Sequence, residues 1–311
     1  MTNKSIKIFA PATVANVACG FDIFGFALDN PGDELSVTLN NSSNVKITKI
    51  SGDSGRLPLD PQKNTAGVSV LKFLEHLKSK QGLDIELHKK MPLGSGLGSS
   101  AASSVGSLFA VNALLGHPLS PLELLPFAME GERVACGTAH ADNVAPGLLG
   151  GFVLIRSYSP LDVIQVPCAL NLYCTILHPD IEIRTETARK ILKPNITMQQ
   201  HVVQTGNATG LILGLTQGDA DLIHKCLQDV IAEPIRSTLI PGFQGIKEAA
   251  LHAGALGCSI SGSGPSLFAL SLTNTDAEKI GEAMSRTCQE NNLNSHLYIS
   301  KMNFEGPRVL S

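Results

Sequence analysis

A glycine-rich segment constrains this chain more than any other feature of its sequence. Residues 92–102, PLGSGLGSSAA, stand between an expected strand at 83–87 and an expected helix at 99–115. Alternate glycines let backbone N–H groups approach an oxyanion, and the first turn of the next helix adds unpaired N–H donors and a partial positive charge. The segment therefore indicates a phosphate-binding loop, although a plain glycine turn before a buried helix fits the same residues.

This loop belongs to neither of two common nucleotide motifs. No Lys precedes the Ser99-Ser100 pair, so it is not a Walker A loop. The spacing Gly-x-Gly-x-Gly, without an acidic residue about 20 positions later, is not that of a dinucleotide-binding fingerprint.

Two further segments favour a ligand site. Ser261 to Ser266, SGSGPS, is a second turn of small residues that can approach a ligand, although a hairpin turn has the same composition. Asn16 and Asp22 are polar residues within the otherwise apolar stretch 11–25. Because a buried, unpaired carboxylate is costly, we expect Asp22 to have a cationic partner from the protein or from a ligand.

The remaining pattern predicts an α+β protein of two domains, residues 1–158 and 159–311. The first half is expected to contain strands at 6–10, 34–39, 45–50 and 83–87, helices at 64–78, 99–115 and 121–133, and a functional loop at 137–151. The second half is expected to contain strands at 170–177, 266–272 and 296–300, with one more before 266, and helices at 185–192, 243–253 and 276–290 and two across 197–231.

Composition argues against a nucleic-acid partner, an export signal and a membrane span. The 27 acidic and 24 basic residues give a net charge of −3, so nucleic acid is not an expected partner. The seven cysteines form no Cys-x-x-Cys pair, which favours reduced thiols and a cytoplasmic location. Pro11, Asn16 and Asp22 interrupt the apolar run 8–28, so neither an export signal nor a membrane span is expected.

The three singled-out segments together resemble a known family. PATVAN through GFD (11–22), PLGSGLGSSAA (92–102) and SGSGPS (261–266) resemble, in this order, the three motifs of the GHMP small-molecule kinases, over nearly the whole chain. Four more segments, at 139–146, 150–151, 185–189 and 233–236, resemble the branch that acts on L-homoserine.

The resemblance implies a reaction and a fold. The reaction is ATP-dependent phosphorylation of the side-chain hydroxyl of L-homoserine to O-phospho-L-homoserine, on the route to threonine. The fold is a two-domain GHMP kinase fold, with an ATP-binding, ribosomal-S5-domain-2-like N-terminal domain and a ferredoxin-like C-terminal domain. A homodimer is expected because twofold dimers are the commonest oligomers.

The resemblance also implies roles for individual residues. ATP would contact Asn64 and the loop residues Pro92, Leu93, Gly94, Ser95, Gly96, Leu97, Gly98, Ser99, Ser100, Ala101 and Ala102. Mg²⁺ would bind Ser100 and Glu132, whose oxygens suit a hard cation.

For the amino acid, Asp22 with Asn16 would hold the ammonium, Arg189 and Arg236 the carboxylate, and Asn143, His140 and Thr185 would lie near the hydroxyl. Asn143, Ser100 and Glu132 would then be the catalytic residues. An amide has no useful basicity, so catalysis would depend on positioning and charge stabilisation rather than on a strong general base.

Other interpretations fit parts of the same pattern. A kinase of the same family acting on mevalonate, a sugar or a diphosphocytidyl polyol would be favoured by Asp at position 143 or by the absence of an arginine pair. A nucleotide-sensing module is disfavoured by the presence of both Ser100 and Glu132. His140-x-Asp142 could be half of a metal site whose other ligands are missing.

Overall fold

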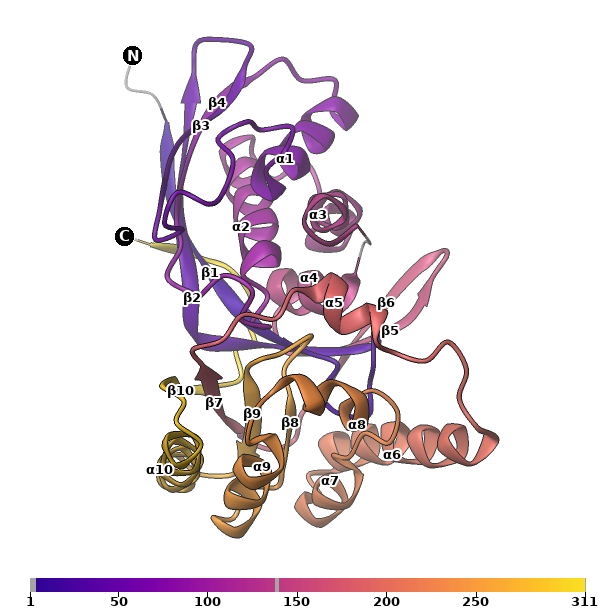
Figure 1. Cartoon of the computed structure of the whole chain (residues 1–311). Coiled ribbons are helices and arrows are strands. Elements are labelled where there is room, and N and C mark those ends of the chain that lie inside the picture. The colour runs from indigo at the N-terminus through magenta and orange to yellow at the C-terminus, as the bar shows by residue number, and fades with distance from the viewer. Residues whose placement is uncertain (1–3, 138–139, 311) are drawn as a thin grey trace.

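The computed structural model describes residues 4–137 and 140–310, which form two sheets covered by helices (Figure 1). The first half contains β1 (Ser5–Ala15), β2 (Phe24–Asn40), β3 (Val45–Ser51), α1 (Thr65–His76), β4 (Gly82–His88), α2 (Ser99–Leu114), α3 (Pro121–Cys136), α4 (Ala141–Leu149), β5 (Phe152–Tyr158) and β6 (Leu161–Val166). The second contains β7 (Tyr173–Pro179), α5 (Thr185–Lys190), α6 (Met198–Gln217), α7 (Ala220–Cys226), α8 (Glu233–Arg236), the short 3₁₀ helix Ser237–Leu239, α9 (Phe243–His252), β8 (Gly257–Ile260), β9 (Leu267–Ser271), α10 (Asn274–Glu290), β10 (Ser295–Lys301) and β11 (Arg308–Leu310).

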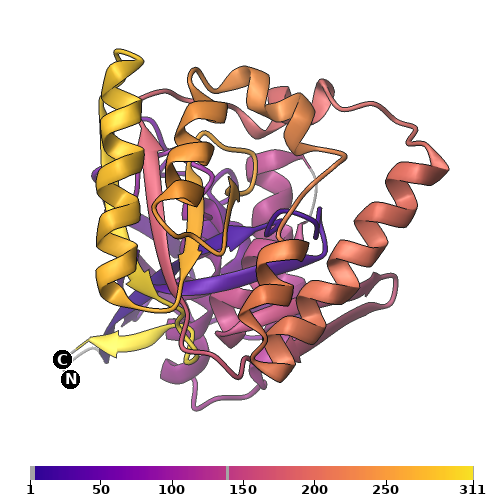
Figure 2. The same ribbon diagram turned by 90° about the horizontal axis from the view of Figure 1, so that it is seen from below.

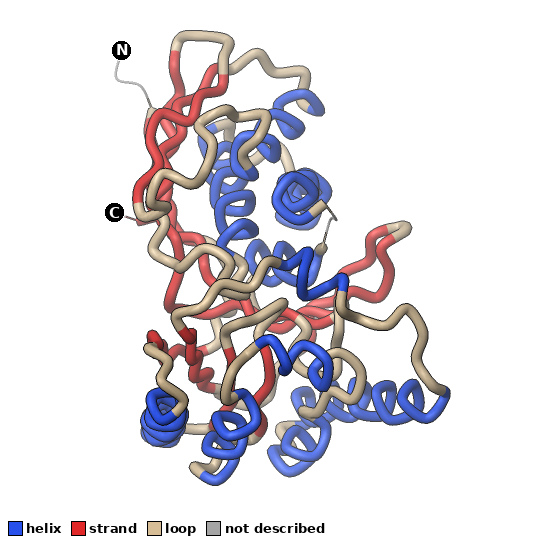
Figure 3. The backbone as a smooth tube through the Cα atoms, viewed as in Figure 1, coloured by secondary structure: helices blue, strands red, loops and turns tan. Residues whose placement is uncertain are grey.

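The larger sheet has seven strands. Its main path is β11-β1-β2-β4-β3, β5 pairs with β2, and β6 pairs with β5. Helices α1 to α4 lie on one side of this sheet, as the backbone trace shows (Figure 3). Helix α2 has no charged residue and is buried along most of its length, because it packs between the sheet and its neighbouring helices. A Cβ on Gly106 would lie 2.2 Å from the Leu35 side chain, so this glycine allows α2 to pack closely on β2.

The smaller sheet has four antiparallel strands in the order β10-β7-β9-β8. In chain order its strands and the helices α9 and α10 give the sequence βαββαβ, which is the ferredoxin-like arrangement. The expected fold of this half is therefore confirmed. Seen from below, α10 lies beside β7 and α6 lies on the opposite side of this half (Figure 2).

A shared core joins the two sheets. The main cluster of buried apolar residues includes Phe26 and Phe152 from the larger sheet and Phe268 from β9. A second cluster lies beneath α9 and α10. Strand β11 brings the end of the chain back to β1, with Val309 opposite Ile8. Cys19, Cys168, Cys174, Cys226, Cys258 and Cys288 are free thiols, and all of these except Cys168 are buried.

The prediction of a functional loop at 137–151 is wrong over most of this segment. Residues 141–149 form helix α4, while Thr138 and Ala139 lie outside the described residues. Gly137 and Gly150 have φ angles of 74° and 73° and end α3 and α4, respectively. The glycines therefore mark helix ends rather than a continuous loop.

The first two strands extend further than expected, because β1 and β2 are buried on both faces along part of their length and so lack a clear alternation there. The hairpin of β5 and β6 was not expected. The proposed division between residues 158 and 159 falls in its turn, while both strands belong to the larger sheet, and the division stays a prediction. No helix in the described ranges has the length and apolar character that a membrane span requires.

We expect that Phe268→Ala weakens the junction of the two sheets. The Phe268 ring is fully buried and meets Phe26 edge-on at a centroid distance of 6.2 Å. Its removal should lower the free energy of unfolding by about 3–5 kcal/mol, measured by urea denaturation. Phe304 is 53% exposed, so Phe304→Ala is a matched control expected to cost less than about 1 kcal/mol. Equal losses in the two variants would contradict this account of the core.

Candidate active site

A pocket of about 370 Å³ takes its walls from both halves of the molecule. Most of the residues singled out in the sequence line it: Asn16, Asp22, Asn64, Leu93, Gly94, Ser95, Gly96, Gly98, Ser99, Ser100, Glu132, His140, Asn143, Thr185, Arg189 and Arg236. The remaining four, Pro92, Leu97, Ala101 and Ala102, are not among the lining residues. Leu97, Ala101 and Ala102 are instead buried in the core, so only their backbone atoms remain available for a ligand.

Direct hydrogen bonds bring the three small-residue segments together. The backbone N–H of Gly262 donates to the carbonyl of Ala15 at 3.1 Å, and the Ser261 hydroxyl donates to the carbonyl of Gly96 at 2.7 Å. The Ser266 N–H donates to the Ser95 carbonyl at 3.2 Å. The turn between β8 and β9 thus contacts both the end of β1 and the glycine-rich loop.

The glycine-rich loop requires its glycines. Gly96 and Gly98 have φ angles of 79° and 68°, which residues other than glycine rarely adopt. A Cβ on Gly96 would lie 2.4 Å from the Ser261 carbonyl oxygen, and one on Gly98 would lie 2.1 Å from Thr13 Oγ1. Helix α2 starts at Ser99 without a side-chain cap, so its first N–H groups remain available to an anion.

A buried ion pair lies beneath this loop. Lys89 and Asp33 pair directly, with their side chains only 1% and 3% exposed. Lys89 Nζ also donates to the Ser99 carbonyl at 2.7 Å, while Asp33 accepts from the Ser99 hydroxyl at 3.1 Å. The two side chains therefore fix the first residue of α2 from both sides. No sequence pattern predicts this pair, because its members are 56 residues apart.

Glu132, near the end of α3, is a buried acid that also lines the pocket. Burial raises its pKa to about 7, while a hydrogen bond with Ser100 and the charge of Lys89 oppose that rise. Its Oε1 atom has no hydrogen-bond partner. A cation in the pocket would meet one unused carboxylate oxygen and the nearby Ser100 hydroxyl. No cluster of three or more His, Cys, Asp or Glu suited to a metal occurs in the described ranges, so the His140-x-Asp142 pair has no further ligands of these types there.

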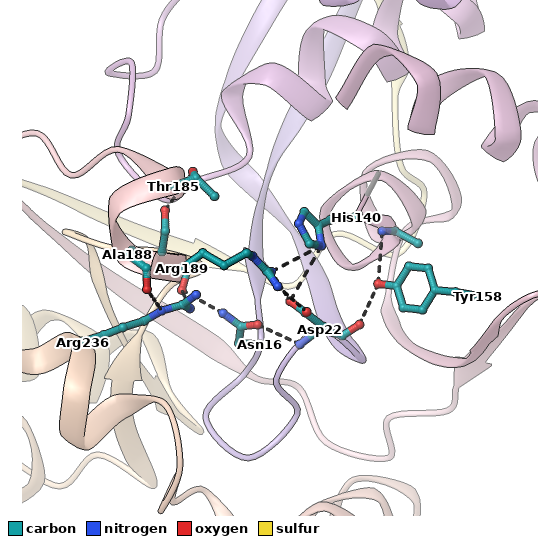
Figure 4. Close-up of polar contacts among 11 residues, drawn as sticks. Asn16, Asp22, His140, Tyr158, Thr185, Ala188, Arg189 and Arg236 are labelled. Atoms are coloured by element: carbon teal, nitrogen blue, oxygen red, sulfur yellow. Dashed lines mark hydrogen bonds and ion pairs between the residues drawn. The ribbon is translucent and has the colours of Figure 1, made fainter. Parts of the chain in front are cut away.

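A group of charged side chains lies at the other end of the pocket (Figure 4). Arg189 on α5 binds Asp22 through two hydrogen bonds of 3.0 and 2.8 Å. The expectation that Asp22 has a cationic partner is therefore confirmed. The Asn16 side chain accepts from the Asp22 N–H at 3.0 Å and donates to the Gly262 carbonyl at 2.8 Å, which ties the Asp22 loop to the turn between β8 and β9.

Arg236 adds a second guanidinium, which has no carboxylate partner in residues 4–137 and 140–310. It donates to the carbonyls of Ala188 and Gly262 at 3.2 and 3.0 Å. Burial and the nearby charge of Arg189 lower the pKa of Arg236. The Phe21 ring lies 5.4 Å from the Arg189 guanidinium carbon and 5.0 Å from that of Arg236. This end of the pocket therefore offers two guanidinium groups that suit an anion.

Polar groups at the start of α4 complete the wall. Thr13 Oγ1 donates to Asn143 Oδ1 at 2.7 Å, and His140 Nδ1 lies 3.8 Å from Asp22 Oδ1. Burial lowers the pKa of His140, with the Asp22 charge opposing this shift. Thr185 and Ser263 share a hydroxyl hydrogen bond of 3.2 Å.

Tyr158, which the sequence analysis did not single out, holds two of these segments together. Its hydroxyl donates to the Asp22 carbonyl at 2.7 Å and accepts from the Ala141 N–H at 3.3 Å. Asn64 caps α1, since it accepts from the Ala66 N–H and donates to the Pro58 carbonyl.

Unsatisfied polar atoms concentrate in this pocket. In the described part of the chain, four buried side-chain atoms lack a hydrogen-bond partner: Ser95 Oγ, Glu132 Oε1, Asp142 Oδ1 and Arg189 Nε. All four residues line the pocket. Buried polar groups are almost always satisfied in folded proteins, so their concentration here indicates a site that is completed by a polar ligand.

Known proteins resemble this chain over its full length. The model for "GHMP kinases N terminal domain" matches residues 64–151, and that for "GHMP kinases C terminal" matches residues 211–290. A homoserine kinase from Chlorobium phaeobacteroides is 52% identical over 319 residues, covering 99% of this chain and 100% of that relative.

Solved structures of kinases also resemble this chain over nearly its full length. The crystal structure of homoserine kinase from Cytophaga hutchinsonii has a TM-score of 0.97 and 58% identity, covering 100% of this chain and 98% of that one. A mevalonate kinase from L. major in complex with R-mevalonate has a TM-score of 0.74 at 16% identity, covering 97% of each chain. The latter likeness shows a shared fold alone.

Lys89→Met tests whether the buried ion pair supports the loop. The change leaves the Asp33 carboxylate buried without its cation, and we expect it to lower the free energy of unfolding by about 3–5 kcal/mol. Lys90, the next residue, pairs with Glu34 at the surface. Lys90→Met is therefore the matched control and should cost at most about 1 kcal/mol in urea denaturation. A similar small loss of stability in both variants would show that the buried pair does not support this loop.

Proposed function

The chain belongs to the GHMP kinase family, and we propose that it transfers a phosphoryl group from ATP to the side-chain hydroxyl of L-homoserine, giving O-phospho-L-homoserine for threonine synthesis. The names of its relatives support the substrate. The pocket itself is the main support for the proposal. Its lining combines the glycine-rich loop, two arginines and four buried polar atoms that lack a hydrogen-bond partner in the described part of the chain.

The glycine-rich loop is the proposed site for the phosphates of ATP. The N–H groups of the first turn of α2 and the unpaired Ser95 hydroxyl can donate to phosphate oxygens. Asn64 lies at the start of α1 on the same pocket wall, and Arg56 and Lys63 add positive charge nearby. A nucleotide with its base near α1 and its phosphates along the loop would point its terminal phosphate toward Asn143.

Ser100 and Glu132 fit a magnesium ion. The unpaired Glu132 Oε1 is a buried oxygen without a donor, and a divalent cation would stabilise the charged form of this acid. We propose that these two residues hold Mg²⁺ together with phosphate oxygens. When bound, the ion neutralises charge on the phosphates.

The arginines are the proposed site for the substrate carboxylate. Among the described residues, Arg189 Nε has no hydrogen-bond partner and the hydrogen bonds of Arg236 go to backbone carbonyls, so both guanidiniums can donate to a carboxylate. Asp22 with Asn16 remains the proposed contact for the ammonium, although both Asp22 oxygens already bind Arg189. His140 and Thr185 would border the bound amino acid.

Asn143 would orient the hydroxyl that is phosphorylated. Its Oδ1 already accepts a hydrogen bond from Thr13, which leaves its amide N–H groups to donate to the hydroxyl oxygen. An amide in this role positions the hydroxyl but does not remove its proton. We therefore propose that alignment and charge stabilisation, without a strong general base, account for catalysis. We further propose that the protein acts in the cytoplasm as a homodimer, on the basis of its unpaired cysteines and the prevalence of twofold dimers.

A coupled assay of ADP release tests the proposal directly. Purified protein is given ATP, Mg²⁺ and one acceptor at a time: homoserine, mevalonate, galactose or shikimate. We expect homoserine to have the highest kcat/KM, because it alone among these carries both an ammonium and a carboxylate. Equal or faster turnover of mevalonate or galactose would reject homoserine as the substrate.

Ser100→Ala and Glu132→Ala test the proposed magnesium ligands. Because an ion that bridges phosphate oxygens acts most strongly in the transition state, kcat should fall about 10²-fold or more. ATP affinity, measured by isothermal titration, should change far less. A variant that keeps the wild-type kcat would be excluded from the magnesium site.

Arg189→Ala and Arg236→Ala test carboxylate binding. Each loss of a charged hydrogen bond should cost about 1.5–3 kcal/mol, or roughly 10- to 200-fold in kcat/KM for homoserine, with little change in ATP affinity. Lys at either position should restore activity only in part, because it lacks the planar fork.

A substrate analogue provides the control for the arginine variants. The amino alcohol 3-aminopropan-1-ol keeps the hydroxyl and the ammonium but lacks the carboxylate. The wild-type protein should use it poorly, and the arginine variants should discriminate little between it and homoserine. Arg236→Ala is the cleaner variant, because Arg189→Ala also frees Asp22. Retention of the wild-type preference in both variants would place the carboxylate elsewhere.

A further inference from the structure

The charged side chains at the amino-acid end of the pocket are unequally paired. Arg189 and Arg236 provide two cations, while Asp22 provides one carboxylate that uses both oxygens on Arg189. A zwitterionic amino acid brings a carboxylate for the arginines and an ammonium that needs its own acceptors. An acceptor whose lone pairs are not already committed to an arginine would serve this ammonium better than Asp22 does.

Asp142 meets this requirement. It lies in the first turn of α4, between His140 and Asn143, and it lines the same pocket although it is only 3% exposed. Its Oδ1 atom has no hydrogen-bond partner among the residues that the structure describes. Two donors of this part of the pocket are committed elsewhere, because the Tyr158 hydroxyl donates to the Asp22 carbonyl and the Ala141 N–H donates to Tyr158.

A buried carboxylate oxygen without a donor is costly unless a ligand supplies one. Burial, with the nearby Asp22 charge adding to it, raises the pKa of Asp142 to about 7. A cation placed between Asp142 and Asp22 would stabilise the charged carboxylate of each. This is the chemical character of an ammonium group.

We propose that Asp142 accepts a hydrogen bond from the α-ammonium group of the substrate, beside Asp22, and thereby selects an amino acid over the corresponding hydroxy acid. This inference rests on the proposed function and assigns a specificity residue within the same site. Asp22 would then also orient Arg189 toward the substrate carboxylate, because its two hydrogen bonds hold the guanidinium in place. Asn143, the next residue, would face the reacting hydroxyl from the same helical turn.

The test compares two acceptors in wild-type protein and in Asp142→Asn. Homoserine has the ammonium, and 4-hydroxybutanoate keeps the carboxylate and the hydroxyl but lacks it. We expect the variant to raise KM for homoserine about 10-fold or more, with kcat changed by only a few fold, since a uniform binding contact is lost. The ratio of kcat/KM for homoserine to that for 4-hydroxybutanoate should fall by a similar factor.

Two further variants separate this role from a structural one. Asp84→Asn makes the same chemical change on β4, where Asp84 binds Asn40 outside the pocket, and should leave the ratio unchanged. Asp142→Ser provides a second substitution should the amide fail to fold, with thermal unfolding as the check. It should lower the ratio in the same direction.

The outcomes are distinct. An unchanged ratio in folded Asp142 variants overturns the inference, whether or not overall activity falls. An equal fall in kcat for both acceptors also overturns it, because that result indicates a base or a structural support. Wild-type protein that does not phosphorylate homoserine overturns the proposed function and this inference with it, whereas active wild-type protein with an unchanged ratio overturns the inference alone.

Discussion

The turn between β8 and β9 is the constraint on which the pocket depends. Gly262 donates its N–H to β1 and accepts, at its carbonyl, from both Asn16 and Arg236. Ser261 binds the carbonyl of Gly96 in the glycine-rich loop. The strands that carry these loops belong to two sheets, so the shared core around Phe26 and Phe268 sets the distance at which they meet. A shift of one sheet would separate the glycine-rich loop from the arginines.

The pocket concentrates groups that destabilise the folded chain without a ligand. Glu132 and Asp142 are buried acids with raised pKa values, and each retains an unpaired oxygen. Because a ligand that satisfies such groups binds only the folded state, it stabilises that state by mass action. In natural proteins, buried polar groups that lack hydrogen-bond partners occur mainly at functional sites, and the unpartnered atoms of this pocket agree with that tendency. The buried pair of Lys89 and Asp33 differs, because each member is fully hydrogen-bonded and supports the loop.

Sequence reasoning succeeded where the cause is local. The helix after Gly98, the helix that begins next to Asn64 and the turn at Ser261 follow from spacing, turn chemistry and composition, and the expected cation beside Asp22 follows from the cost of a buried acid. It failed where the cause is distant in the chain. Lys89 looks like any surface lysine until β2 brings Asp33 beside it, and Tyr158 contacts Asp22 across 136 residues. Helix α4 was missed because Gly137 and Gly150 suggested a loop but in fact end two helices. The roles of individual pocket residues stay predictions.

The absence of a side chain at Gly98 links the phosphate loop to the proposed catalytic amide. A Cβ at this position would lie 2.1 Å from Thr13 Oγ1 and 2.9 Å from Asn143 Oδ1, so it would disrupt the hydrogen bond between them. That bond occupies the only strong acceptor of the amide and leaves Asn143 as a donor. The loop that is proposed to bind phosphate is thus also what gives Thr13 room to orient Asn143. In phosphoryl transfer with a loose transition state, alignment of the hydroxyl with the phosphate matters more than early removal of its proton. In the proposed mechanism, Gly98 would therefore help to position both the phosphate and the hydroxyl, and a strong general base would not be needed.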